Sequence, residues 1–104
     1  MRVSKRKRLE SRGWRVGDTG EFLNLSDEES AYIELRLKLA QGLRARRSSQ
    51  GLTQSDLAKA IRSSQSRVAK MEAGDPTVSI DLLVKSLLRL GASNREVAQI
   101  IAQA

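Results

Sequence analysis

Hydroxyl side chains that are followed three positions later by a carboxylate divide this sequence into helices. Such pairs occur at three places: Ser26 with Glu29, Thr53 with Asp56, and Ser93 with Glu96. Each pair is a capping box, in which the hydroxyl accepts a hydrogen bond from an N–H of the first helical turn. The carboxylate in turn accepts one from the N–H of the capping residue. The pairs therefore predict where three helices begin.

Two serines predict two more helix starts. Ser64 precedes a short segment that ends near Glu72, and Ser79 precedes a run with apolar residues at helical spacing. The helix after Ser26 has its own apolar stripe, formed by Tyr32, Ile33, Leu35, Leu37, Leu39, Ala40 and Leu43. No segment alternates between polar and apolar residues as a strand does. We therefore expect an all-α fold of five helices with short connections.

A chain of 104 residues has room for one domain with a single core. We expect that domain to span residues 26–104, behind an irregular, basic and partly flexible extension at residues 1–25. The extension holds seven Lys or Arg and three Asp or Glu, which gives +4 of the total net charge of +7. Its first eight residues are expected to form a solvated tail, with an arm that contacts DNA as the alternative.

Residues 13–25 of the extension contain three glycines among five apolar residues, which are Trp14, Val16, Phe22, Leu23 and Leu25. This segment is too broken for a helix and too apolar for a plain linker. It is expected either to bind a partner protein or to fold back onto its own domain.

The composition excludes most catalytic chemistry. The sequence contains no cysteine and no histidine, so it has no thiolate zinc site, no Cys or His nucleophile and no His general base. Carboxylates such as Asp75, Asp81 and Glu96 lie at expected caps and turns, where they have a structural role. We therefore expect neither an enzyme nor a bound metal or cofactor.

The charge and the few aromatic residues indicate the kind of partner. A net charge of +7 favours a polyanion. Only three aromatic residues are present, so stacking of single-stranded bases has little support and duplex DNA is the expected partner. Apolar stretches are short and none follows the basic start, so neither a membrane span nor a secretory signal is expected. The expected location is cytoplasmic and associated with the nucleoid.

The segment 53–72 has the features of a DNA-reading motif. Two short helices joined by a tight turn share a small apolar core, which is the pattern of a helix-turn-helix. The outward residues of the second helix are Gln65, Ser66, Arg67 and Lys70. Because Gln pairs with adenine and Arg with guanine in the major groove, we expect Gln65 and Arg67 to read bases. Ser64, at the start of that helix, is expected to hold a phosphate.

The stretch GLTQSDLAKAIRSSQSRVAKMEAGDPTVSIDLLVKSLLRLGAS resembles the helix-turn-helix of the Cro and phage-repressor (XRE) family. The matching positions are Leu52, Gln54, Leu57, Ala58, Ile61, Ser64, Val68, Met71, Glu72 and Gly74. The resemblance extends over about residues 35–93. It implies the five-helix fold of lambda-repressor-like domains.

The resemblance also implies roles for individual residues. Gln54 is expected to contact phosphate and to brace Gln65, and Arg47 to reach Glu72 in a structural ion pair. Relatives commonly carry glycine, at positive φ, at the turn position where this chain has Arg62. We expect a slightly strained or modified turn there, at a cost of about 1 kcal/mol, with Arg62 placed near a phosphate.

The stretch GWRVGDTGEFLNLSDEESAYIELRLKLAQGLRARR, residues 13–47, is similar to HigA-like antitoxins of type II toxin-antitoxin operons. The similarity implies that Trp14, Val16, Phe22 and Leu23 bind a RelE/HigB-like toxin, while the domain binds operator DNA and represses its own operon. Two alternatives remain open. One is a plain phage-type or chromosomal regulator without a toxin, and the other is a protein-binding antitoxin with little independent DNA binding.

A homodimer is expected because one half-site read by four or five side chains gives too little discrimination. Two half-sites about 34 Å apart on one face of the duplex give enough. The expected interface consists of Leu90, Val97, Ile100 and Ile101. The alternative is that these residues complete the core of their own domain.

Overall fold

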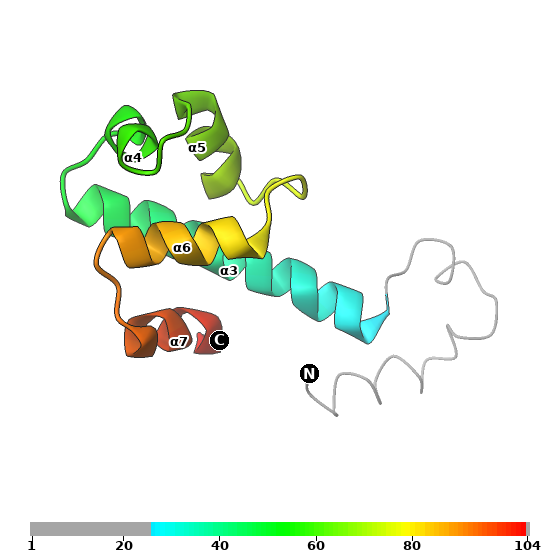
Figure 1. Cartoon of the computed structure of the whole chain (residues 1–104). Coiled ribbons are helices and arrows are strands. Elements are labelled where there is room, and N and C mark those ends of the chain that lie inside the picture. The colour runs from blue at the N-terminus through cyan, green and yellow to red at the C-terminus, as the bar shows by residue number, and fades with distance from the viewer. Residues whose placement is uncertain (1–25, 104) are drawn as a thin grey trace. The chain divides into compact units, whose positions relative to one another are not determined.

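The computed structural model describes residues 26–103, which contain five α-helices and no strand (Figure 1). The helices are α3 (Asp27–Ser49), α4 (Gln54–Ala60), α5 (Gln65–Glu72), α6 (Ile80–Arg89) and α7 (Asn94–Ala102). The all-α prediction is confirmed. No helix in this part of the chain is long and apolar enough to cross a bilayer. The extension at residues 1–25, with its expected tail and apolar segment, lies outside the described residues.

Each helix starts where the sequence predicts. In the three capping boxes, both hydrogen bonds are present, with donor–acceptor distances of 2.8–3.1 Å. Ser64 Oγ accepts a hydrogen bond from the N–H of Arg67, and Ser79 Oγ accepts one from the N–H of Leu82, both at 3.1 Å. These local signals therefore set the five helix starts.

Four of the helices end in the same motif. The chain reverses through one left-handed residue, and the next N–H donates to the carbonyl five residues earlier, which is a Schellman motif. Those donors are Leu52, Ser63, Asp75 and Ala92, with N···O distances of 2.8–3.1 Å. The left-handed residues are Gly51, Arg62, Gly74 and Gly91, with φ of 71°, 57°, 74° and 90°. Arg62 is thus the one side chain in a set of glycines.

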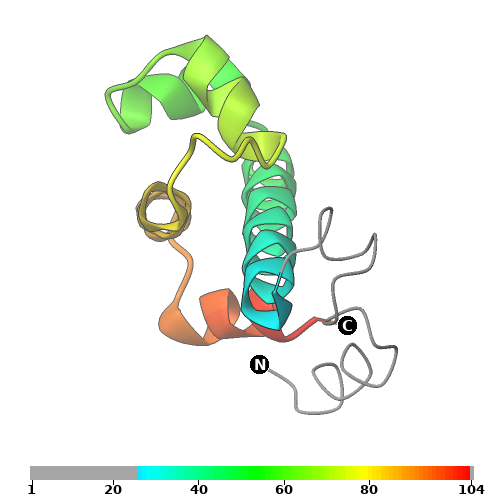
Figure 2. The same cartoon turned by 90° about the vertical axis from the view of Figure 1, so that its right-hand side faces the viewer.

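Residues from Leu35 onward form a compact unit around one core. Four helices and two loops supply the buried side chains, which are Leu39, Leu43, Leu57, Ala58, Val68, Met71, Val78, Leu83, Leu87, Leu90 and Ala92. In both Figure 1 and Figure 2, α4 and α5 lie on one side of α6, and α7 lies on the other. The core thus packs against the inner faces of α4 and α5 and leaves their outer faces exposed to solvent.

The apolar stripe expected on α3 is buried over only part of its length. Leu39 and Leu43 have no exposed surface, whereas Tyr32, Ile33 and Leu37 are 40–47% exposed. The core cluster includes α3 residues only from position 35 onward. The spacing of the apolar residues therefore predicted the helix correctly but overestimated how much of its apolar stripe is buried.

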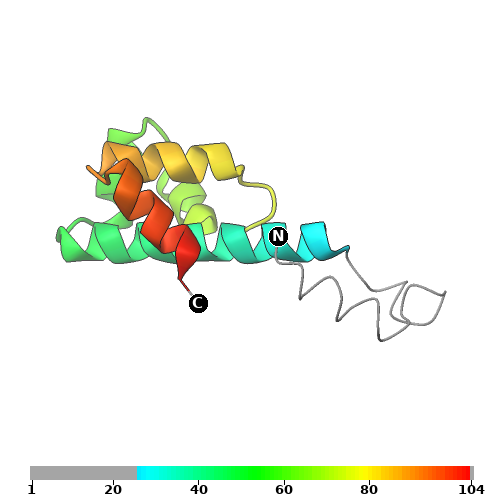
Figure 3. The same ribbon diagram turned by 90° about the horizontal axis from the view of Figure 1, so that it is seen from below.

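The C-terminal end of α3 is tied to the loop between α6 and α7. Arg46 Nε and Gln50 Nε2 both donate to the backbone oxygen of Leu90, at 3.1 and 2.7 Å. Arg46 also lies 3.5 Å from the carboxylate of Glu96. Figure 3 shows α7 running obliquely across α3 and α6. These bonds fix where α7 begins.

Candidate nucleic-acid interface

The outer face of α5 is polar and open to solvent. Val68 and Met71 point into the core and have no exposed surface. The remaining side chains of the helix include four exposed polar ones, Gln65, Ser66, Arg67 and Lys70. The exposed set therefore contains two amide or guanidinium groups of the kind that reads base edges, a hydroxyl and an ammonium.

The first residue of α5 is held by the first residue of α4. Gln65 Nε2 donates to Gln54 Oε1 at 2.6 Å, and Gln54 Nε2 donates to Glu72 Oε1 at 3.1 Å. The Gln54 amide is therefore held from both sides. Gln65 keeps its Oε1 and its second Nε2 hydrogen, which are the atoms that an adenine edge requires.

Arg47 joins the same network from α3. Its guanidinium makes two bonds to the Glu72 carboxylate, Nε to Oε2 at 2.6 Å and Nη2 to Oε1 at 3.0 Å. Arg47 Nη1 also donates to the Leu52 backbone oxygen at 2.7 Å. The side chains of Arg47 and Glu72 are 13% and 4% exposed. This pair is structural, because its polar atoms are occupied inside the protein.

The ion pair keeps Glu72 ionised. Burial alone would raise the pKa of Glu72, but the hydrogen bonds from Arg47 and Gln54 and the charge of Arg47 bring it below the usual value. The bond to Glu72 raises the pKa of Arg47. A chain of hydrogen bonds thus runs from α3 through Glu72 and Gln54 to Gln65, where α5 begins.

The turn between the two helices is short and closed. Ile61 caps α4, Arg62 follows in the left-handed region, and the Ser63 N–H donates to the Ala58 oxygen at 2.8 Å. The expectation of a strained residue at position 62 is confirmed. The turn keeps the Schellman arrangement that glycine would adopt. The presence of Arg62 in place of glycine therefore changes the conformational energy of the turn and not the path of its backbone.

Comparison with known families accounts for this arrangement. Residues 43–93 match the helix-turn-helix family model. The matched span runs from the last turns of α3 to the residue before α7. The sequence has no significant match among curated proteins or solved structures. The helix-turn-helix family consists of DNA-binding transcription regulators, which are not typically enzymes, and this supports DNA-binding regulation for the chain.

The helix-turn-helix includes a polar hollow that the sequence did not indicate. It measures about 210 Å³ and lies between α5 and the loop that follows it; its lining includes Ser64, Arg67, Lys70 and Thr77. Thr77 is fixed there because its N–H and hydroxyl both donate to Asp75 Oδ1, at 2.7 and 2.6 Å. The Asp-x-Thr spacing of this turn was the available signal. Thr77 therefore lies with Ser64, Arg67 and Lys70 at this hollow.

The residues expected to form a dimer interface are divided by the structure. Leu90 is 8% exposed and belongs to the core, and Val97 and Ile100 pack against that core. A Cβ atom on Gly42 would lie 2.8 Å from Ile100 Cδ1, so α7 lies directly on α3. Ile101 is 40% exposed. Of the four, Ile101 offers the most surface to a partner.

Proposed function

We propose that this chain is a dimeric repressor that binds double-stranded operator DNA in a sequence-specific way. The observation that carries the proposal is the exposed polar face of α5, whose first residue is fixed by the Gln54 to Gln65 hydrogen bond. A base-reading side chain must be held in a defined position before DNA arrives, or ordering it reduces the affinity. The match of residues 43–93 to the helix-turn-helix family model supports the DNA-binding part of this proposal.

In this mechanism α5 lies in the major groove. Gln65 offers Oε1 and a free Nε2 hydrogen to adenine, and Arg67 offers its guanidinium to guanine. Lys70 and Ser64 border the polar hollow and hold phosphates, together with Gln54 at the start of α4. Base contacts thus specify the sequence, and phosphate contacts fix the position of the helix.

Dimerisation doubles the number of bases that are read. Two copies of α5 on a two-fold axis contact successive major grooves about 34 Å apart. The exposed Ile101 on α7 supports an interface on that helix. Repression follows when the bound dimer occupies promoter DNA that polymerase needs.

We further propose that the chain is an antitoxin, because residues 13–47 resemble HigA-like antitoxins. In this role Trp14, Val16, Phe22 and Leu23 bind a RelE/HigB-like toxin while α5 binds the operator. Co-expression with such a toxin tests it: we expect a stable complex that is lost on Trp14→Ala with Phe22→Ala. A plain regulator would bind DNA and form no such complex.

Footprinting on the chain's own promoter tests the central proposal. At physiological salt and with non-specific competitor DNA, we expect protection of a palindrome with half-sites one helical turn, or a multiple of it, apart. Protection that competitor removes entirely would contradict sequence-specific binding. It would favour the protein-binding antitoxin with little DNA affinity of its own.

A further inference from the structure

A second cavity lies beside the turn, between the end of α4 and α6. It has a volume of about 380 Å³, which is in the range of small-molecule sites. Ile61 and Arg62 line it on the turn side, and Leu82, Ser86 and Arg89 line it on α6. We call it the turn cavity. It is distinct from the polar hollow beside α5, with which it shares no lining residue.

The walls of the turn cavity are mainly apolar. Ile61 and Leu82 are partly buried and pack against the core, so they form a fixed surface. An aromatic ring or a short aliphatic chain placed against them would leave water, which favours binding.

The rim of the turn cavity is positively charged. Arg62, Lys85 and Arg89 line it and are exposed. Lys85 lies 3.2 Å from the Asp81 carboxylate, so its charge is balanced. Within residues 26–103 the side chains of Arg62 and Arg89 have neither a hydrogen bond nor an ion pair. Two positive charges at this rim are therefore available to an anion.

A buried hydroxyl also lies at the turn cavity. Ser86 has no exposed surface, and among the described residues its Oγ has no hydrogen-bond partner. Burying a hydroxyl without a partner costs free energy, whereas an alanine would fill the same place without that cost. The helix-turn-helix contacts described above make no use of this group.

We propose that the turn cavity binds a small organic anion that has an apolar part, such as an aromatic monocarboxylate. Its carboxylate accepts hydrogen bonds from Arg62 and Arg89, and its ring lies on Ile61 and Leu82. Ser86 Oγ turns toward the carboxylate and donates the hydrogen bond that it lacks. Each of the three features is thereby used by one ligand.

Occupancy would act on DNA binding through the turn, and this part rests on the proposed function. Arg62 is the residue that connects the cap of α4 to the start of α5. A carboxylate that pairs with Arg62 removes one positive charge from the region near phosphate. We expect the affinity for operator DNA to fall by about two- to tenfold.

The ligand site is tested without DNA, by NMR titration of the ¹⁵N-labelled full chain with sodium benzoate. The control is benzamide, which has the same ring and no charge, and sodium chloride matches the ionic strength. We expect saturable amide shifts at Ile61, Arg62 and residues 82–89 with benzoate alone. Equal shifts with benzamide, or none with either compound, would overturn the site.

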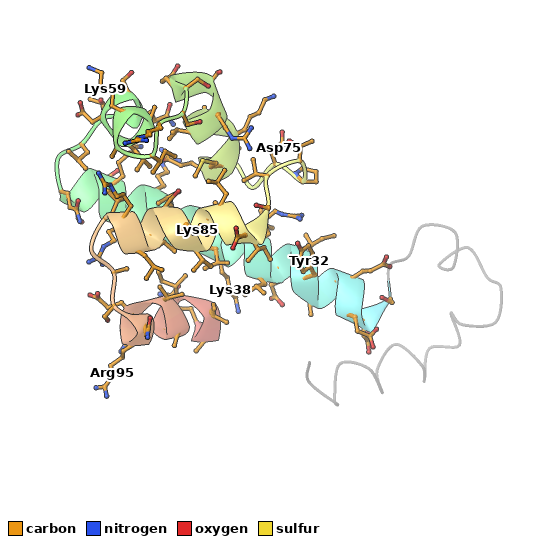
Figure 4. All side chains as sticks on the ribbon, viewed as in Figure 1. Tyr32, Lys38, Lys59, Asp75, Lys85 and Arg95 are labelled. Atoms are coloured by element: carbon orange, nitrogen blue, oxygen red, sulfur yellow. The ribbon has the colours of Figure 1, made fainter. Side chains whose placement is uncertain are left out.

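Variants identify the cations. The double variant Arg62→Gln with Arg89→Gln should lose at least tenfold in benzoate affinity, because two charged partners are removed. Arg95→Gln is the control for each single variant, since it removes one charge and Arg95 lies on α7 and not at the cavity; Figure 4 shows Arg95 and the cavity residue Lys85 on separate helices. If Arg95→Gln loses as much affinity, general charge attraction explains the binding and the site is refuted.

Ser86→Ala separates the hydroxyl from the charges and should lower benzoate affinity by about three- to tenfold. The DNA measurement follows as a separate arm. If benzoate shifts the amide signals of the turn and leaves the affinity for operator DNA unchanged, the coupling to DNA binding is refuted and the ligand site is retained. If the chain binds no operator at all, the NMR titration still decides the site.

Discussion

Arg62 occupies a left-handed backbone position that three other turns of the same fold give to glycine. A Cβ atom at this φ clashes with the neighbouring carbonyl, so Arg62→Gly should raise the free energy of unfolding by about 1 kcal/mol. Urea unfolding measures this change. Arg62→Ala removes the same charge but keeps the Cβ atom. If the Ala variant gains as much stability as the Gly variant, charge repulsion and not backbone strain is the cause.

Arg67 and Lys70 lie on the same exposed face of α5. We expect Arg67 to contact a base and Lys70 to contact a phosphate. Arg67→Ala should cost about 1–3 kcal/mol of operator binding and relax the preference at one base pair. Lys70→Ala should weaken binding to all sequences evenly and reduce the salt dependence by about one phosphate contact. Competition binding with single-base operator variants distinguishes them. A uniform loss in both would contradict direct base reading by Arg67.

At the level of elements, the Arg47–Glu72 pair connects α3 to α5. Arg47→Met leaves the Glu72 carboxylate, which is 4% exposed, without its charged partner. The loss should be about 3 kcal/mol of unfolding free energy, measured with urea. Arg47→Met combined with Glu72→Leu should recover much of that loss, because no buried charge remains. A single variant that unfolds like the wild type would show that the pair contributes nothing to stability.

The sequence predicted the helix boundaries because each is specified locally. Ser64 and Ser79 each cap the helix that follows with one hydroxyl. Such hydrogen bonds depend only on neighbouring residues and not on the rest of the fold. Burial was harder to predict. The spacing of Leu37 on α3 matches that of buried residues, yet its side chain is 42% exposed. Which part of a stripe is covered depends on helices distant in the sequence.

The candidate interface follows the same division. The outward residues of α5 were predictable from helical periodicity, since Val68 and Met71 fix the inner face. Thr77 was missed because its place beside Lys70 depends on how the loop after α5 folds back. Leu90 was assigned to an interface although its side chain belongs to the core, because its burial depends on residues distant in the sequence, which no local pattern contains.

Among residues 26–103, four carboxylates with lowered pKa values make the stability of the folded molecule depend on pH. In Asp56 a hydrogen bond from the Thr53 backbone lowers the pKa, and in Glu96 one from the Ser93 backbone does. Thr77 lowers the pKa of Asp75 through its side chain. In Glu72 burial raises the pKa, but the bonds from Arg47 and Gln54 leave it lowered.

The folded state therefore binds fewer protons than the unfolded state at acid pH. The stability that these groups give is fully present above the usual carboxyl values of 3.8 and 4.5 and is lost as the pH falls through the lower folded values. Urea midpoints measured from pH 7 downward should decline below about pH 5. Glu72→Gln should show a smaller decline. A midpoint that stays constant to pH 3 would contradict the assignment.

Assembly is tested at the exposed end of α7. Ile101→Asp places a charge at a residue that is 40% exposed, so the monomer should keep its fold while the proposed dimer dissociates. Sedimentation velocity measures the mass, and circular dichroism checks the helix content. Arg95→Asp, on the same helix, controls for the added charge. A dimer that persists in the Ile101 variant would place the interface elsewhere.

The two hydrogen bonds to the Leu90 carbonyl have a consequence for how the chain folds during synthesis. Their donors, Arg46 and Gln50, precede the acceptor by 44 and 40 residues. On a ribosome, α4 and α5 therefore leave the exit tunnel well before the group that closes the loop around them. Until Leu90 has left the tunnel, α6 cannot complete the core against which both helices pack. The outer faces of α4 and α5 are thus translated before the residues of α6 and Leu90 that complete the core beneath them.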